Sequence, residues 1–83
     1  MISIYEEVVI MIATIAKVDK NRINEKTNLF EDLDMDSLII LDFVNQMEER
    51  WDFKLSEHPE LLDEMETVES LVAYLKYEIG GVE

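Results

Sequence analysis

Apolar residues repeat at helical spacing in the first stretch of the chain, where they would form one buried face of an α-helix. The expected face consists of Ile4, Val8, Met11, Ile12 and Ile15. Ser3 stands just before this face, and a serine hydroxyl there can accept a hydrogen bond from the free amides of the first turn. The pattern therefore predicts a helix over roughly residues 3 to 17.

A second helical pattern starts at Ser37, and Asp36 immediately before it is a typical N-cap residue. The acidic residues of this pattern fall on the face that is expected to meet solvent. They are Asp42, Glu48 and Glu49, and the inward face is expected to hold Leu38, Leu41, Val44, Met47 and Trp51.

A short helix is expected next, because Pro59 suits a first turn, where its missing N–H would have no partner anyway. Whether Ser56 or His58 caps this helix stays open, and His58 is expected to be a solvated residue beside the proline. The helix would continue through Leu61, Leu62 and Met65.

The last helix is predicted to open at Thr67 and to stop at Gly80 and Gly81, since glycine readily ends a helix. Its expected buried stripe is Val68, Leu71, Val72, Leu75 and Ile79.

Between the first two helices, in residues 18–36, the apolar residues have no regular spacing and polar residues dominate. The apolar residues scattered through this loop are expected to pin it to the core; they are Ile23, Leu29, Phe30 and Leu33. Nothing alternates with the period of a strand. The fold class is therefore all-α: residues 1–83 form a single domain, a small bundle of three main helices plus one short helix, with a long loop between helices 1 and 2.

Charge and composition exclude several classes of function. Seven basic residues against twenty acidic ones leave a net charge of −13, which disfavours binding to nucleic acid and favours partners with basic patches. Cysteine is absent, so the chain has no disulfide and no thiolate of its own. The apolar N-terminus carries Glu6 and Glu7, and no apolar run reaches the ~20 residues of a membrane span. A cytoplasmic monomer is expected.

Ser37 is the residue most suggestive of chemistry. At the start of a helix its oxygen would lie near free backbone amides and the positive end of the helix dipole, which favour a phosphate group. A catalytic pair of Ser37 with His58, the single histidine, would also need an orienting group and an oxyanion hole, and the sequence shows neither. The serine is therefore interpreted as an attachment point for a phosphate-linked group.

The flanking residues resemble a known family. The run from Asn28 through Ser37 to Leu38, Asn-Leu-Phe-Glu-Asp-Leu-Asp-Met-Asp-Ser-Leu, is similar to the motif of acyl carrier proteins and related phosphopantetheine-binding domains. Residues 65–71, Met-Glu-Thr-Val-Glu-Ser-Leu, resemble the entry of that family into its last helix. The resemblance covers nearly the whole chain.

The resemblance implies a freestanding carrier and not an enzyme. Ser37 would receive 4′-phosphopantetheine from coenzyme A through a phosphopantetheinyl transferase, and the thiol of the arm would carry acyl groups as thioesters. Asp36 would help the transferase place magnesium and coenzyme A. Further partners would be an acyl ligase or acyltransferase and synthase-type enzymes with basic docking patches. The docking surface would include Leu38, Asp42, Glu48 and Glu49.

Three positions depart from the pattern of the family. Asp34 stands where glycine is usual, so it must either adopt a left-handed conformation or take a different turn. Ile39 stands where an acidic residue is usual. One of Ile39 and Ile40 is expected to be exposed, and Ile39 is the expected contact for partner enzymes. Asn45 replaces a usual apolar docking residue. Together they indicate a specialised carrier of a fatty-acid or polyketide-type pathway.

Three other interpretations of the sequence compete with an acyl carrier. Asp32, Asp34 and Asp36 have the spacing of the first ligands of an EF-hand, but the sixth position is Ser37 instead of Gly and the twelfth is Phe43 instead of Glu. A dedicated calcium site is therefore not expected. An aminoacyl or peptidyl carrier of nonribosomal synthesis would use the same arm with a different cargo. An unmodified acidic helical interaction module would have no arm at all.

Overall fold

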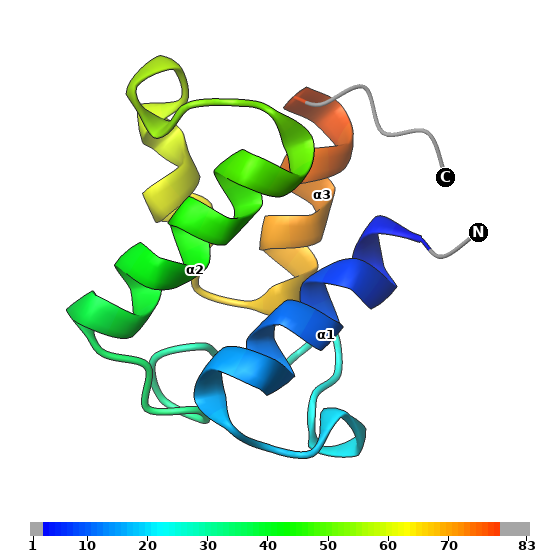
Figure 1. The fold of residues 1–83 in the computed structure, drawn as a ribbon. Helices are drawn as coiled ribbons and strands as arrows, with labels where there is room; N and C mark the ends of the chain where they lie inside the picture. Colours follow the sequence, from blue (N-terminus) through cyan, green and yellow to red (C-terminus); the bar gives the residue numbers. More distant parts are fainter. Residues whose placement is uncertain (1–2, 79–83) are drawn as a thin grey trace.

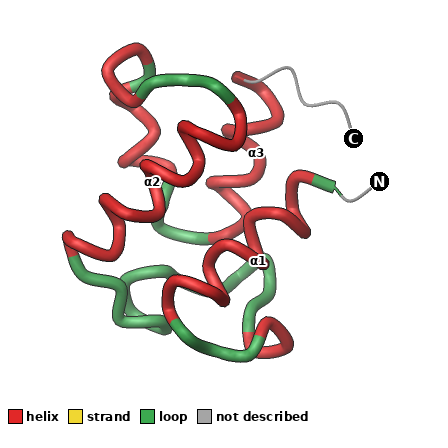
Figure 2. Tube along the Cα trace, in the orientation of Figure 1, coloured by secondary structure: helices red, strands yellow, loops and turns green. Residues whose placement is uncertain are grey.

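Three α-helices form the bundle: α1 (Ile4–Ala16), α2 (Ser37–Trp51) and α3 (Val68–Glu78), as seen in a computed structural model that describes residues 3–78 (Figure 1). Helix α1 packs against both α2 and α3. Three short 3-10 helices lie in the connections: η1 (Lys20–Arg22), η2 (Leu55–Glu57) and η3 (Pro59–Glu64). Within residues 3–78 there is no strand (Figure 2). The predicted all-α class is confirmed.

The boundaries of α1 agree with the prediction. Ser3 Oγ accepts a hydrogen bond from the Glu6 N–H at 3.1 Å, which confirms Ser3 as the N-cap. Lys17 ends the helix in the left-handed conformation, with φ of 59°. Met11 and Ile15 are only half-buried. The buried residues of the helix are Ile4, Val8, Val9 and Ile12.

The inward face of α2 differs from the predicted one. Leu38 is 76% exposed and Leu41 is 53% exposed, although both were expected to face the core. Val44 and Met47 are buried, as predicted, but Ile40 and Phe43 take the inward positions expected for Leu38 and Leu41, and Trp51 is half-buried. Apolar residues are so dense at the start of this helix that two overlapping stripes have helical spacing. In the structure the stripe that contains Phe43 faces the core, and the large ring of Phe43 is fully buried.

Helix α3 buries Val68, Leu71, Val72 and Leu75, as predicted. Thr67 precedes it, and its Oγ1 accepts a hydrogen bond from the Ser70 N–H at 3.2 Å. The predicted contributions of Ile79, Gly80 and Gly81 lie outside the described residues.

The loop between α1 and α2 is attached to the start of α3. The Leu29 N–H donates to the Glu66 carbonyl at 2.9 Å, and the Val68 N–H donates to the Thr27 carbonyl at 3.1 Å. Ile23 and Leu29 are buried anchors, as predicted. Phe30, by contrast, is 47% exposed, so its predicted role as an anchor is wrong. The backbone bonds to α3 hold this part of the loop without the Phe30 ring.

The segment after α2 folds as two 3-10 helices where one short helix was expected. Pro59 lies in the first turn of η3, as predicted, and neither Ser56 nor His58 caps a helix through its side chain. The expectation of a solvated His58 is wrong, because the ring is half-buried and has edge contacts with Phe53 and Tyr74. Packing of η3 against α3 places the imidazole between these two aromatic rings.

One hydrogen bond ties η3 to α3 and shifts two pKa values. The Tyr74 hydroxyl donates to Glu60 Oε2 at 2.7 Å. Partial burial and this bond raise the pKa of Tyr74 well above its ordinary value of 10.0. The same bond lowers the pKa of Glu60 below its ordinary value of 4.5. Folding therefore favours a neutral phenol beside an ionised carboxylate.

Replacing Tyr74 with phenylalanine is expected to lower stability between about pH 4.5 and 10. The contribution of the bond in the wild type is lost as the pH falls through the lowered pKa of Glu60, and again as it rises through the raised pKa of Tyr74. Melting temperatures of both proteins should thus converge at the two extremes of pH. Tyr77→Phe is the control, since Tyr77 is 83% exposed; a Tyr74→Phe difference that is constant with pH contradicts the prediction.

Candidate functional site

Ser37 is the first residue of α2, and its side chain is exposed. Asp36 is the N-cap, as predicted: its backbone is extended and its Oδ1 accepts the Ile39 N–H at 3.0 Å. Because Asp36 satisfies this amide, the Ser37 hydroxyl is not needed to cap the helix. In the described part of the chain it makes no hydrogen bond to another residue. The oxygen is therefore free for chemistry from the solvent side.

The approach to Ser37 depends on a turn at Asp34. Asp34 has φ of 54°, so it adopts the left-handed conformation, which was one of the two predicted outcomes of an aspartate in place of glycine. Aspartate tolerates this region better than most non-glycine residues. The turn directs Met35 into the core, where it is 3% exposed. With Met35 buried and Asp36 capping, Ser37 is left pointing outward.

The aspartates of the acidic loop that have EF-hand spacing lie in separate surroundings. Asp32 Oδ2 accepts the Asn28 N–H at 2.8 Å, and Asp36 Oδ1 accepts the Ile39 N–H. These two carboxylates thus bond to the backbone. Among residues 3–78, the three aspartates do not gather their oxygens into one ligand group.

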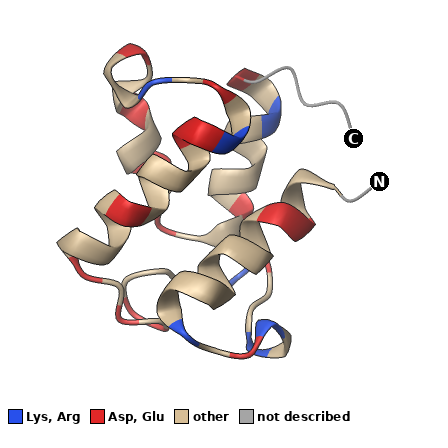
Figure 3. Cartoon of the chain, in the orientation of Figure 1, with Lys and Arg blue, Asp and Glu red and all other residues tan. Residues whose placement is uncertain are grey.

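An exposed face runs along α2 from Ser37 and is here called the α2 face. It consists of Leu38, Leu41, Asp42, Asn45 and Glu49, which are all exposed. These positions have the spacing of one helix side. Figure 3 shows acidic residues placed along this helix. The sequence pattern predicts a core position for Leu41, but this residue is exposed. Its exposure follows only once the structure shows which of the two overlapping apolar stripes faces inward.

The two other predicted docking residues have different surroundings. Ile39 is half-buried and packs against the core, while Ile40 is fully in the core. Neither isoleucine is the exposed apolar residue of this helix; Leu38 and Leu41 are. Glu48 is half-buried, and its Oε2 accepts the Leu55 N–H at 2.7 Å. This bond fixes the segment after α2.

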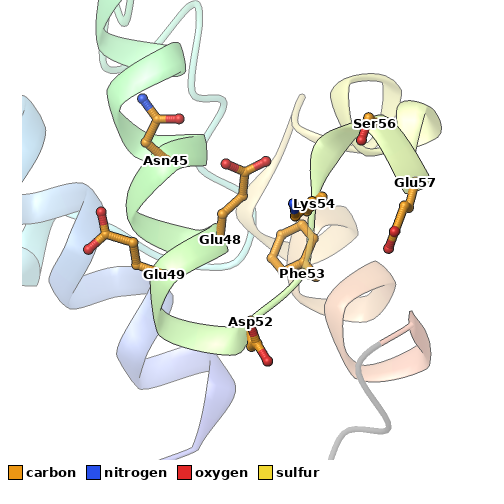
Figure 4. Close-up of a pocket in the computed structure, with 8 residues that line it drawn as sticks. All are labelled: Asn45, Glu48, Glu49, Asp52, Phe53, Lys54, Ser56 and Glu57. Atoms are coloured by element: carbon orange, nitrogen blue, oxygen red, sulfur yellow. The ribbon is translucent and has the colours of Figure 1, made fainter.

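An acidic groove lies at the C-terminal end of α2 (Figure 4). Glu48 lies on the side of α2 that faces Phe53 and Lys54, and Glu49 points to the other side of the helix. The groove contains four carboxylates and one ammonium group, so it favours positively charged partners. Its lining residues are Asn45, Glu48, Glu49, Asp52, Phe53, Lys54, Ser56 and Glu57.

Comparison with known proteins agrees with this geometry. The family model described as "Phosphopantetheine attachment site" matches residues 6–75, which places the chain in the class of phosphopantetheine-binding domains. An acyl carrier protein of Chlamydia felis (strain Fe/C-56) is 31% identical over 78 residues, which cover 94% of this chain and 97% of that protein. One from Lactobacillus acidophilus is 31% identical over 77 residues, or 93% and 94% of the two chains.

The chain therefore belongs to the acyl carrier protein family. Members of this family carry a covalent 4′-phosphopantetheine group and are carriers rather than enzymes. Their partners are transferases and synthases that act on that group. No helix within residues 3–78 has the length and apolar character needed to cross a membrane.

Proposed function

We propose that Ser37 is the attachment point of 4′-phosphopantetheine and that residues 1–83 act as one acyl carrier domain. The observation that carries this proposal is the free, exposed hydroxyl at the first position of α2. The arm, when bound, supplies a thiol that carries acyl groups as thioesters. The chain itself has no cysteine, so it provides no competing thiol.

The start of α2 suits a phosphodiester for two reasons. The first turn of a helix presents backbone amides without partners, and the helix dipole adds a partial positive charge. The Asp36 side chain accepts a hydrogen bond from the Ile39 N–H. This bond fixes the start of the helix while Ser37 stays at the surface. We assign Asp36 a second role beside the incoming transferase, where its carboxylate would face the metal and coenzyme A.

The α2 face is the proposed docking surface. Leu38 and Leu41 expose large apolar side chains beside Ser37, and burying such apolar surface against a partner favours association. Asp42 and Glu49 add negative charge that speeds encounters with basic patches. Expected partners are a phosphopantetheinyl transferase, an acyl ligase or acyltransferase, and synthase-type enzymes.

The same face supports a specialised fatty-acid or polyketide-type pathway. Asn45 is exposed in the middle of the face, where it offers an amide and no apolar surface. Ile39 stands where an acidic residue is usual in the family and packs against the core, so this position presents no carboxylate. Both differences change what a partner enzyme meets, so they favour a restricted set of partners.

Leu41→Ala is expected to lower the kcat/KM of a phosphopantetheinyl transferase for this chain by roughly 10-fold, the loss typical of one buried interface anchor. Leu62→Ala is the matched control, because Leu62 is 47% exposed but lies on η3, outside the α2 face. Circular dichroism would verify that both variants are folded. Equal rates for the two variants would contradict docking through α2.

The test of the function is intact-mass spectrometry of the chain after incubation with coenzyme A and a broad-specificity transferase. A mass increase of one phosphopantetheine group is expected. An unchanged mass would contradict the proposal and favour an unmodified acidic interaction module. The loaded chain is then offered to an acyl ligase and to an amino-acid adenylating enzyme; loading by the adenylating enzyme alone would make it a peptidyl carrier.

A further inference from the structure

A cluster of metal-ligating side chains lies away from Ser37, at the end of the bundle where α3 finishes (Figure 1). It consists of His58, Glu60 and Glu78, and one ligand atom from each lies within 4.8 Å of the others. His58 precedes η3, Glu60 lies in the first turn of η3, and Glu78 is the last residue of α3. Two elements distant in sequence thus contribute to one group.

The imidazole of His58 is held in one orientation. Its ring meets Phe53 edge to face, with centroids 5.7 Å apart, and meets Tyr74 in the same manner at 6.4 Å. These contacts direct Nδ1 toward Glu78 Oε1 at 3.2 Å. A ring fixed in this way loses little further freedom when it binds an ion.

The carboxylate of Glu60 is positioned by a neighbour outside the cluster. The Tyr74 hydroxyl donates to Glu60 Oε2 at 2.7 Å, and the carboxylate has a second oxygen to offer. Ligating carboxylates in metal sites are commonly held by an outer hydrogen bond of this kind. Tyr74 therefore contacts two members of the cluster: its hydroxyl donates to Glu60 and its ring contacts His58.

We propose that His58, Glu60 and Glu78 form a binding site for a divalent cation of the zinc class. Metal–ligand bonds of about 2.0–2.2 Å in a tetrahedron place ligand atoms about 3.3–3.6 Å apart. The separation of His58 Nδ1 and Glu78 Oε1, 3.2 Å, already fits such an edge. Glu60 lies within 4.8 Å of both other ligand atoms, and rotamer adjustment of its exposed side chain can bring its oxygen to the third ligand position.

The nitrogen ligand decides the class of ion. Imidazole suits Zn²⁺ and its neighbours, whereas Mg²⁺ and Ca²⁺ prefer sites made only of oxygen. Three protein ligands leave a fourth position for water. A bound ion would join η3 to the end of α3, and it would stabilise the fold because the unfolded chain lacks the preformed site. This site is separate from Ser37, so it does not depend on the proposed carrier function.

The test is calorimetric titration of the chelator-treated chain, without an affinity tag, with Zn²⁺ in physiological salt. One Zn²⁺ per chain is expected, with Mg²⁺ failing to compete at equal concentration. His58→Asn is expected to weaken binding by more than about 10-fold, since loss of an outer-shell partner alone typically costs 10–100-fold. Glu57→Gln is the control, because it removes an exposed carboxylate next to the cluster without removing a ligand.

A second measurement uses the wild-type chain alone. His58 is its single histidine, so the imidazole nitrogen signals in NMR belong to one residue. One equivalent of Zn²⁺ should shift the Nδ1 signal, and one equivalent of Mg²⁺ should not. An unmoved imidazole signal, or a His58→Asn variant that binds Zn²⁺ as well as Glu57→Gln does, would overturn the proposal and assign the ion to the general acidic surface.

Discussion

Ser37→Ala is expected to remove all transfer of phosphopantetheine to this chain, because the mutation deletes the oxygen that would form the phosphodiester. Intact-mass spectrometry after incubation with coenzyme A and a transferase should show one added group on the wild type and none on the variant. The fold should tolerate the change. Asp36, not Ser37, accepts the amide hydrogen bond at the start of α2, so the free energy of unfolding is expected to change by less than about 0.5 kcal/mol.

Ser56→Ala is the matched control for that experiment. Ser56 is also exposed and also lies in a helical turn, at η2, but no capped α-helix starts there. It should be modified as completely as the wild type. A Ser37→Ala chain that still gains the group would show that another hydroxyl carries the arm, and the assignment of Ser37 would then be abandoned.

Phe43→Ala is expected to have the largest effect on stability. The ring of Phe43 is fully buried on the inward stripe of α2, and truncation of a core phenylalanine typically costs about 3–5 kcal/mol. Domains of this size have a total stability of about 4–12 kcal/mol. The variant should therefore lose a large part of its stability. Chemical denaturation, followed by the far-ultraviolet signal of the helices, measures the difference directly.

Phe30→Ala provides a control with the same change of side chain. Phe30 is 47% exposed in the loop between α1 and α2, so its truncation should cost much less than that of Phe43. Equal losses would contradict the orientation of α2 described above. A larger loss at Phe30 would restore the loop anchor that the sequence pattern predicts.

Local features of the chain were readable from sequence because they depend on neighbouring residues. Ser3 and Asp36 cap helices as their side chains and positions predict. For Asp34 the sequence allowed a left-handed conformation or a different turn, and the structure shows the left-handed one. Ser37 belongs to this group, since its position at the start of α2 depends only on the cap and on the helical pattern that follows.

The orientation of α2 required the tertiary structure. Its first turns are apolar on nearly every side, so periodicity alone allows either Leu41 or Phe43 to face inward, and packing against α1 and the shared core decides. In the loop before α2, Phe30 is exposed and Met35 is buried. This difference also depends on how the loop packs against the core, and no periodic pattern in the loop predicts it.

The sequence by itself determined the helical class, the caps and the position of Ser37 at the start of α2, because each follows from local hydrogen bonding and spacing. Only the tertiary structure decided that Leu38 and Leu41 face solvent beside Ser37. It also brought His58 and Glu60 next to Glu78. Contacts between residues far apart along the chain depend on how the helices pack, and no local pattern records that packing.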